Sequence, residues 1–338
     1  MYILIAILIF GILIFVHELG HFMFAKKFGV AITEFSLGMG PKIVSKRGKD
    51  DVDYSLRVLP IGGYVAMVGE DEDSDDPNSF EKKPAWQRFI IVVAGAMMNL
   101  LIGVIIIFFM MLSQSKYASN VVGDFFEGSV SNEFLEIGDE IIEVDGNRVH
   151  TGQELGYEIM RNGYEPISVT VIRNGEKITI DNVEFGTQTE QGISFGSIDF
   201  MVTPEKKTFG TVFKYTFFTC KSIIKMVWES LFDLITGRYG IEQVSGPIGV
   251  TEVISEAAKT DMYSVFYIAA VLAINLGIFN LIPFPALDGG TLVFLTIEMI
   301  TKKRVPKKIE YIIKAIGFAL LMALVVFVAF KDIIFLFK

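Results

Sequence analysis

Cysteine is almost absent from this chain, in which Cys220 is the single thiol. One cysteine cannot form an intrachain disulfide, and it cannot build a metal site from several thiolates. We therefore expect Cys220 to serve as a small apolar residue in the packing. Histidine is also scarce, with three residues, so a motif that uses two of them carries weight.

Excess positive charge is missing as well, because 39 acidic residues outnumber 30 basic ones and leave a net charge of −9. This balance argues against nucleic acid as a partner. No basic segment precedes the first apolar run, which begins directly at Met1. We therefore expect no cleavable signal peptide.

Apolar residues are abundant, at 51% of the chain, and the mean hydropathy is +0.49. These values are too high for a soluble enzyme, whereas 20% charged residues are too many for a chain that lies wholly in a membrane. The composition predicts a polytopic α-helical membrane protein with a water-facing domain. Four stretches can cross a bilayer core of about 30 Å. They are residues 1–25, 87–113, 262–290 and 312–336.

Lysine and arginine are concentrated in two of the connecting segments, residues 26–86 and the short loop before the last span. Positively charged loops stay on the cytoplasmic side of a membrane. The segment between the second and third spans is rich in acidic residues and should be extracytoplasmic. Four spans meet these conditions with both termini outside.

The cytoplasmic segment 26–86 carries a predicted β-hairpin at residues 52–69. Residues 53–60 and 64–68 have the composition of two short strands, and Ile61-Gly62-Gly63 between them would supply the turn. The hairpin is apolar enough to associate with the membrane. The acidic run that follows at residues 71–76 should be a solvated loop.

The extracytoplasmic segment contains a compact α+β domain over residues 116–200. Residues 153–160 can form a helix, and Asn174-Gly175 is a strong hairpin signal. The pattern G-D-x-I-x-x-V-D-G at 138–146 resembles PDZ domains, which bind extended peptide ends by strand addition. The alternative is a generic β-sandwich spacer. His150 in this domain is expected to be a surface residue.

Residues 208–237 form a predicted amphipathic helix. Its polar residues recur every four positions and give one polar stripe among aromatic and aliphatic residues: Lys221, Lys225, Glu229 and Asp233. Such a helix is expected to lie at the outer membrane interface. The alternative is a fifth span with a buried polar seam.

The motif H-E-x-x-H occurs inside the first span, at His17, Glu18 and His21. Positions four apart share one face of a helix, so the two imidazoles can bind one Zn²⁺. Zinc lowers the pKa of a water that it binds, and Glu18 is close enough to accept the proton of that water. The alternative is a pair of structural histidines, but ionisable residues within a membrane span generally mark function.

A catalytic zinc site needs a third protein ligand, and Asp288 is the candidate. His17 lies about 24 Å into the first span at 1.5 Å per residue, in its cytoplasmic half. The third span runs inward and brings Asp288 to the same depth. Pro283 and Pro285 break that helix and can open a watery cavity. The alternatives are a helix cap for Asp288 and a simple kink at the two prolines.

With these motifs together, the chain resembles the site-2 protease family of intramembrane zinc metalloproteases, and within it the bacterial RseP/RasP branch. The resemblance covers nearly the whole chain, with one PDZ domain. Ala96 stands where the family often has proline. The motifs that carry the resemblance are His17-Glu18-x-x-His21, Asn280-x-x-Pro283-x-Pro285-x-Leu287-Asp288-Gly289, Pro60-x-Gly62-Gly63-Tyr64, the PDZ-like insert and Ser245-Gly246-Pro247-Ile248-Gly249.

The resemblance implies a function and a set of roles. Glu18 would be the catalytic base, while His17, His21 and Asp288 would hold one zinc ion. The substrate would contact five further residues: Asn280, Asn99, Gly62, Gly63 and Tyr64.

The implied enzyme is a metalloendopeptidase of the bacterial cytoplasmic membrane, with its active site towards the cytoplasm. Its substrates would be single-span proteins trimmed beforehand, such as anti-sigma factor stubs or remnant signal peptides. Its other partners would be peptide ends at the PDZ-like domain and membrane lipid. Two alternatives remain: a membrane zinc carrier or sensor, and a PDZ scaffold without catalysis.

Overall fold

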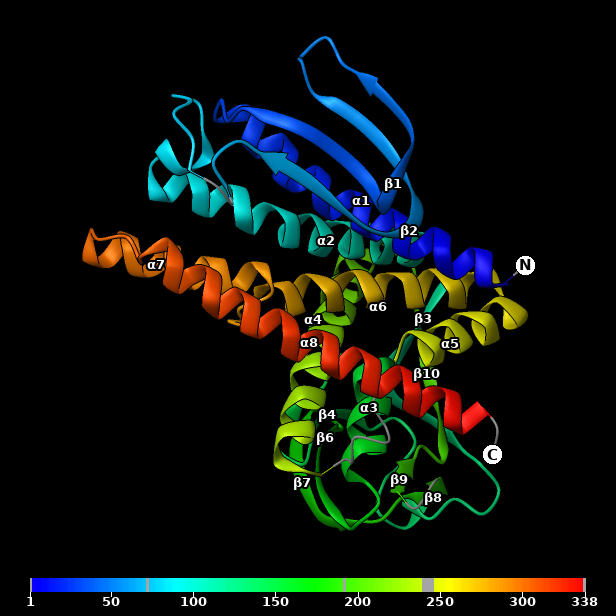
Figure 1. Ribbon diagram of the computed structural model, residues 1–338. Coiled ribbons are helices and arrows are strands. Elements are labelled where there is room, and N and C mark those ends of the chain that lie inside the picture. The colour runs from blue at the N-terminus through cyan, green and yellow to red at the C-terminus, as the bar shows by residue number, and fades with distance from the viewer. Residues whose placement is uncertain (1, 71–72, 191–192, 239–245, 337–338) are drawn as a thin grey trace. The chain divides into compact units, whose positions relative to one another are not determined.

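The computed structural model describes residues 2–70, 73–190, 193–238 and 246–336 (Figure 1). Two compact units divide the chain: residues 1–106 with 224–338 form the first, and residues 107–223 form the second. Ser245 of the Ser-Gly-Pro-Ile-Gly motif lies outside the described residues, as do the first two positions of the acidic run.

Among the described residues, four helices are long and apolar enough to cross a membrane, as the sequence predicted. The protein is therefore a multi-pass membrane protein. The four helices are α1 (Tyr2–Lys27), α2 (Ala85–Ser113), α6 (Met262–Leu281) and α8 (Lys307–Leu336).

The third span was predicted over residues 262–290, with its helix broken at Pro283 and Pro285, and the break is present. Helix α6 ends at Leu281, and residues 282–287 are irregular. Prolines at 283 and 285 explain the break, because proline disfavours helical geometry in the residue before it. A further helix that the sequence did not predict, α7 (Asp288–Thr301), follows immediately. Asp288 is therefore the first residue of a helix.

Another helix that the sequence did not predict is α5 (Pro247–Thr260), which begins with proline in its first turn. It packs in one apolar cluster with α1 and α6. Gly249 N–H donates to the Asp332 carboxylate of α8 at 3.1 Å, so a side chain from another helix caps the N-terminus of α5.

Small residues allow α1, α2 and α6 to pack closely. A Cβ atom at Gly20 of α1 would lie 2.9 Å from Met98 Cγ and closer still to the Ala94 carbonyl of α2. A Cβ at Gly277 of α6 would lie 2.8 Å from the Leu100 side chain of α2. Glycine at such contacts lets helix backbones approach in a membrane.

The predicted hairpin is part of a larger β-element, and the prediction of a turn at residues 61–63 was wrong. The chain forms one long strand, β2 (Asp53–Met67), which continues through Gly62 at a φ of +85°. Its partner is β1 (Ile32–Arg47), which the sequence analysis missed. Strand β1 meets both halves of β2: Phe35 pairs with Val65 and with Tyr54.

The second unit contains the predicted α+β domain, which extends to Lys206. Its main sheet has the order β10-β3-β4-β6-β7, with β5 beside β4, and β8 pairs with β9. The elements are β3 (Lys116–Phe125), β4 (Glu140–Val144), β5 (Asn147–Arg148), α3 (Gly152–Asn162), β6 (Ile167–Arg173), β7 (Glu176–Val183), β8 (Gly186–Glu190), β9 (Ile193–Ser197) and β10 (Phe200–Lys206). Short 3-10 turns lie at Phe80–Lys82 in the first unit and Ser131–Glu133 in this one.

Local signals explain much of this domain. Asn174 and Gly175 both have positive φ between β6 and β7, as a two-residue hairpin turn requires. Thr151 caps α3 by accepting from Glu154 N–H at 3.2 Å. His150 stacks on Phe218 with ring centroids 4.0 Å apart and does not belong to the metal-ligand group described below.

Helix α4 (Phe209–Thr236) continues from the second unit into the first. Its exposed side chains include five aromatic ones: Phe209, Phe213, Phe217, Trp228 and Phe232. Of the predicted polar stripe, Lys225 pairs with Glu229 at 3.6 Å and Asp233 is buried. Cys220 is buried as well, and burial raises the pKa of its thiol to about 11, which suits an inert apolar role.

Candidate metal centre and active site

The two histidines of the H-E-x-x-H motif lie on one face of α1, and their Nε2 atoms are 3.1 Å apart. Gly20 lies between them in sequence and packs against α2, so the helix presents this face to the protein interior. Both imidazoles are largely buried, with side chains 12% and 11% exposed. The spacing predicted from the helical period is therefore present.

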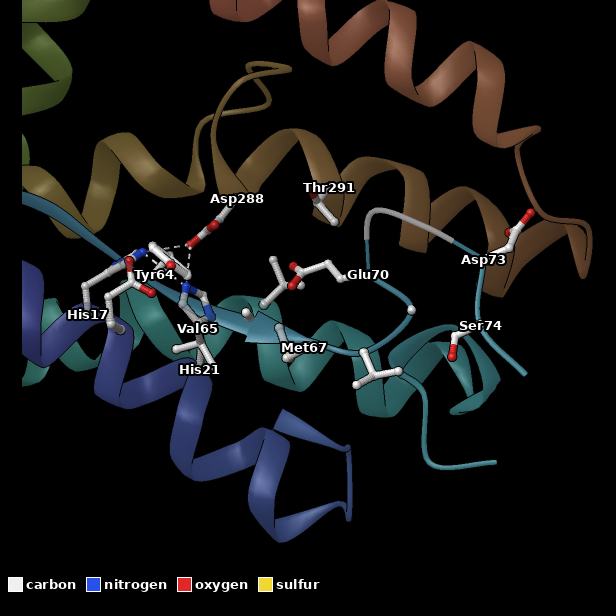
Figure 2. Close-up of a pocket in the computed structure, with 15 residues that line it drawn as sticks. His17, His21, Tyr64, Val65, Met67, Glu70, Asp73, Ser74, Asp288 and Thr291 are labelled. Carbon is white, nitrogen blue, oxygen red and sulfur yellow. Dashed lines mark hydrogen bonds and ion pairs between the residues drawn. The ribbon is translucent and has the colours of Figure 1, made fainter. Parts of the chain in front are cut away.

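Asp288 completes a triangle of ligand atoms with the two histidines (Figure 2). Its Oδ2 atom lies 3.3 Å from His17 Nε2 and 3.4 Å from His21 Nε2. Two zinc bonds of about 2.0–2.1 Å at a tetrahedral angle span about 3.3 Å, so three protein ligands of one zinc ion would have this separation. Asp288 Oδ2 is also buried without a hydrogen-bond donor. The donor set and its spacing fit zinc.

The break between α6 and α7 places this carboxylate. Because α6 ends at Leu281 and α7 begins at Asp288, the ligand stands at the start of a helix beside α1 rather than within a span. Gly289 and Gly290 follow, and a Cβ atom at either position would collide with backbone atoms of the preceding loop. The tight packing of the loop on α7 thus fixes the position of Asp288.

Backbone and side-chain groups orient the imidazoles. His21 Nδ1 lies 2.9 Å from the Ile91 carbonyl, which can only accept, so the hydrogen is on Nδ1 and Nε2 keeps its lone pair. His17 Nδ1 faces two side-chain amides, with Asn99 Nδ2 at 3.3 Å and Asn280 Nδ2 at 3.5 Å. Both predicted asparagines therefore lie beside His17.

Gly95 of α2 is a residue that the sequence analysis did not single out. A Cβ atom there would lie 2.8 Å from His17 Cε1 and would overlap the His21 imidazole. Only glycine leaves room for both rings at this point of α2. Its spacing of four from Asn99 was a usable signal, because both then face α1.

A cavity of about 730 Å³ opens beside the three ligands. Glu18 lines it, and so do residues 64–67 at the end of β2 and Val68 after them. Figure 2 shows Tyr64, Val65 and Met67 of this strand beside the ligand triangle. Four polar lining residues were not predicted: Glu70, Asp73, Ser74 and Thr291. The volume of the cavity lies within the range of ligand-binding pockets, about 300–1,000 Å³.

The two predicted glycines, Gly62 and Gly63, do not line the cavity but lie behind the part of β2 that does. A Cβ atom at Gly63 would lie 3.1 Å from Glu18 Cγ and 3.2 Å from Ile14 Cγ2, so glycine lets β2 approach α1. Gly62 has a positive φ and lies against the Met39 side chain.

A charged network within the sheet holds Tyr64. Arg57 Nη2 donates to the Tyr64 hydroxyl at 2.5 Å and to Glu34 Oε1 at 2.8 Å. Burial would raise the pKa of Glu34, but hydrogen bonds from Ser55, Arg57 and Lys42 outweigh it and lower the pKa to about 2. Burial and the hydrogen bond to Glu34 raise the pKa of the Tyr64 phenol, which stays a neutral hydroxyl at neutral pH.

Comparison with known proteins decides which family this site belongs to. The model of peptidase family M50 matches residues 5–324 of the chain. The chain belongs to peptidase family M50. This is the site-2 protease family, and the protein is a zinc metalloprotease, with His17, His21 and Asp288 as the group that suits zinc.

Relatives of this M50 protease match over almost their full length. A protein of Clostridium perfringens with a provisional zinc metalloprotease name is 36% identical over 99% of each chain. The zinc metalloprotease RasP of Geobacillus kaustophilus is 30% identical over 97% of this chain and 96% of its own. The regulator of sigma-W protease RasP of Bacillus subtilis is 28% identical over 97% of each chain.

Proposed function

We propose that this M50 protease cleaves transmembrane segments of membrane proteins whose extracytoplasmic part has already been trimmed. The observation that carries the proposal is the ligand triangle itself, because two of its three members lie within the apolar helix α1. Anti-sigma factor stubs and remnant signal peptides have the required form, a single span with little mass outside. The name of the Bacillus subtilis relative, regulator of sigma-W protease, supports the first class.

The metal-binding residues, Glu18 and Asn280 would each have a role in peptide hydrolysis. Zinc, when bound by His17, His21 and Asp288, supplies a Lewis acid and lowers the pKa of water. The Glu18 carboxylate accepts a proton and returns it to the leaving nitrogen. The Asn280 amide, at the end of α6 and partly buried, donates a hydrogen bond to the substrate backbone near the scissile carbonyl.

Strand β2 supplies a surface for an extended substrate. Residues 63–67 pair with β1 on one side, and residues 64–68 line the cavity. A helical substrate hides its carbonyl groups, so it has to unwind before hydrolysis. Addition of the unwound segment to β2 would satisfy its backbone groups and present a carbonyl to the ligand triangle.

The orientation of the protein follows from its charge. Lys26 and Lys27 end α1, and a lysine-rich loop precedes α8. Positive charge at these ends supports an orientation with the active site towards the cytoplasm and residues 116–206 outside a bacterial cytoplasmic membrane. The PDZ-like domain would bind peptide ends there, and the exposed aromatic face of α4 would contact lipid at the outer interface.

The test is cleavage of a tagged single-span substrate by purified protein in detergent, with bound zinc measured in parallel. Wild type should cleave within the span, and Glu18→Gln should lower the rate at least 100-fold while it retains one zinc per chain. Glu256→Gln, an exposed carboxylate of α5, serves as the matched control and should be as active as wild type.

Two outcomes would contradict the proposal. Equal cleavage by wild type and Glu18→Gln would remove Glu18 from the chemistry. No cleavage of several trimmed substrates by a zinc-loaded wild type would favour a zinc carrier or a PDZ scaffold instead.

A further inference from the structure

Asn99 is the most enclosed polar residue beside the ligand triangle. It is fully buried, at 0% exposure, in the apolar helix α2. Its Oδ1 atom has no hydrogen-bond partner, while its Nδ2 atom lies 3.3 Å from His17 Nδ1. A buried amide oxygen without a donor is costly, so this arrangement needs a physical explanation.

The chemistry of a zinc-binding imidazole supplies the explanation. His17 can bind zinc through Nε2 only if Nε2 has a lone pair, and the ring hydrogen is then on Nδ1. That N–H needs an acceptor. The amide nitrogens of Asn99 and Asn280 both face it, and an amide nitrogen only donates. A half-turn of one amide about its Cβ–Cγ bond replaces the donor with an oxygen.

Asn99 is the amide that turns. Rotation of the Asn99 amide breaks no hydrogen bond of its Oδ1 atom, because that atom has no hydrogen-bond partner. The nitrogen of Asn99 is also closer to His17 Nδ1 than that of Asn280 is, at 3.3 Å against 3.5 Å. Asn280 is only partly buried, so its amide group is free to serve the substrate.

We propose that Asn99 is a positioning residue of the metal centre: its Oδ1 accepts the Nδ1 hydrogen of His17 and aims Nε2 at Asp288 and the zinc ion. The Ile91 carbonyl likewise accepts the Nδ1 hydrogen of His21 and orients its ring. Helix α2 therefore orients both imidazoles, with Gly95 giving them room one turn before Asn99. Asn99 and Asn280, both expected to contact substrate, then have different roles. The inference rests on zinc ligation by His17 in the proposed function.

Zinc affinity of purified full-length protein, measured by competition with a chromophoric chelator, tests this role. Asn99→Leu keeps nearly the same size but cannot accept, and it should weaken zinc binding about 10–100-fold. Asn99→Asp keeps an acceptor oxygen and should stay within about threefold of wild type. If Asn99 only filled space in an apolar helix, the order would reverse, because leucine suits a membrane interior and aspartate does not.

Controls separate folding and substrate effects from the positioning role. Thermal unfolding and size-exclusion profiles check that each variant folds, and the smaller Asn99→Ala, which also lacks an acceptor, repeats the test if leucine is not tolerated. Asn280→Leu should bind zinc as wild type does but cleave substrate more slowly. Zinc affinity that is unchanged in folded Asn99→Leu and Asn99→Ala would overturn the inference.

The same measurement distinguishes this inference from the proposed function. His17→Ala should lose tight zinc binding. If it binds zinc as wild type does, His17 is not a ligand, and the proposed site itself is wrong. If His17→Ala loses zinc while the Asn99 variants keep it, only the role of Asn99 is overturned.

Discussion

At the scale of single residues, the metal centre depends on glycines, which leave space for neighbouring groups, as much as on the side chains that can bind metal. His17, His21 and Asp288 would supply the ligand atoms, but α2 can lie beside the two imidazoles only where it carries no Cβ atom. Gly95 is therefore part of the site, although glycine has no functional group. The same reasoning applies to Gly63, which lets β2 approach Glu18.

Gly95→Ala should lower zinc affinity at least tenfold and abolish most proteolysis, because the added methyl group would displace the rings of both histidines. The matched control is Gly11→Ala in α1, where nothing lies within 4 Å of the added Cβ. That control should bind zinc normally and unfold at the same or a slightly higher temperature. Equal zinc affinity in the two variants would show that α2 does not confine the imidazoles.

At the scale of elements, the β-sheet of β1 and β2 depends on ionic contacts that bind its two halves together. Glu34 of β1 accepts from Arg57 and Ser55 of β2, and Arg57 also donates to Tyr64 beside the cavity. Charge-assisted hydrogen bonds of this kind contribute about 1.5–3 kcal/mol where they are shielded from water. The sheet therefore couples the position of Tyr64 to the ionisation of Glu34.

This coupling predicts a pH dependence. The pKa of Glu34 in the folded protein is about 2, below its ordinary value of 4.5, so its contribution is complete above about pH 5 and is lost as pH falls towards 2. Glu34→Gln should lower the unfolding temperature by a few degrees at pH 6. The difference from wild type should shrink steadily as the pH is lowered.

Thermal unfolding of both proteins in detergent between pH 6 and pH 3 measures that difference. Because acid weakens the zinc site in both proteins equally, the comparison isolates Glu34. A difference that stays constant over this range would contradict the assignment of the effect to its carboxylate.

At the scale of the whole molecule, the α+β domain from Lys116 to Lys206 is an insertion with adjacent ends. Lys116 at the start of β3 lies directly opposite Lys206 at the end of β10 in the antiparallel pair. The Cα atoms of residues opposed in this way are about 4.5–5.5 Å apart. A short glycine-serine linker can therefore replace residues 117–205 without stretching the chain. This geometry permits a clean test of whether the domain acts as a size filter, that is, whether it excludes substrates that have a large extracytoplasmic part.

The excised protein should still bind one zinc ion and cleave a trimmed single-span substrate at a rate close to that of wild type. Its rate on a substrate with a folded extracytoplasmic domain should rise at least tenfold, because the obstruction has been removed. The measurement is the cleavage rate of each of the two substrates by wild-type and excised protein in the same detergent. Unchanged preference for the trimmed substrate would rule out the filter.

The sequence by itself determined the features that depend on local periods and covalent geometry. The helical period places His17 and His21 on one face, apolar length defines the four spans, and Pro283 with Pro285 ends α6. Each of these follows from neighbouring residues, so no knowledge of distant contacts is required.

Tertiary structure decided the features that depend on residues far apart in the chain. The pairing of β1 with both halves of β2 replaced the predicted hairpin, because strand partners are chosen by packing against α1 rather than by a local turn signal. The closeness of Asp288 to the histidines, the space at Gly95 and the amide of Asn99 beside His17 likewise come from helix packing. The motif supplied the ligands, and the packing of α2 and α7 against α1 gave them their geometry.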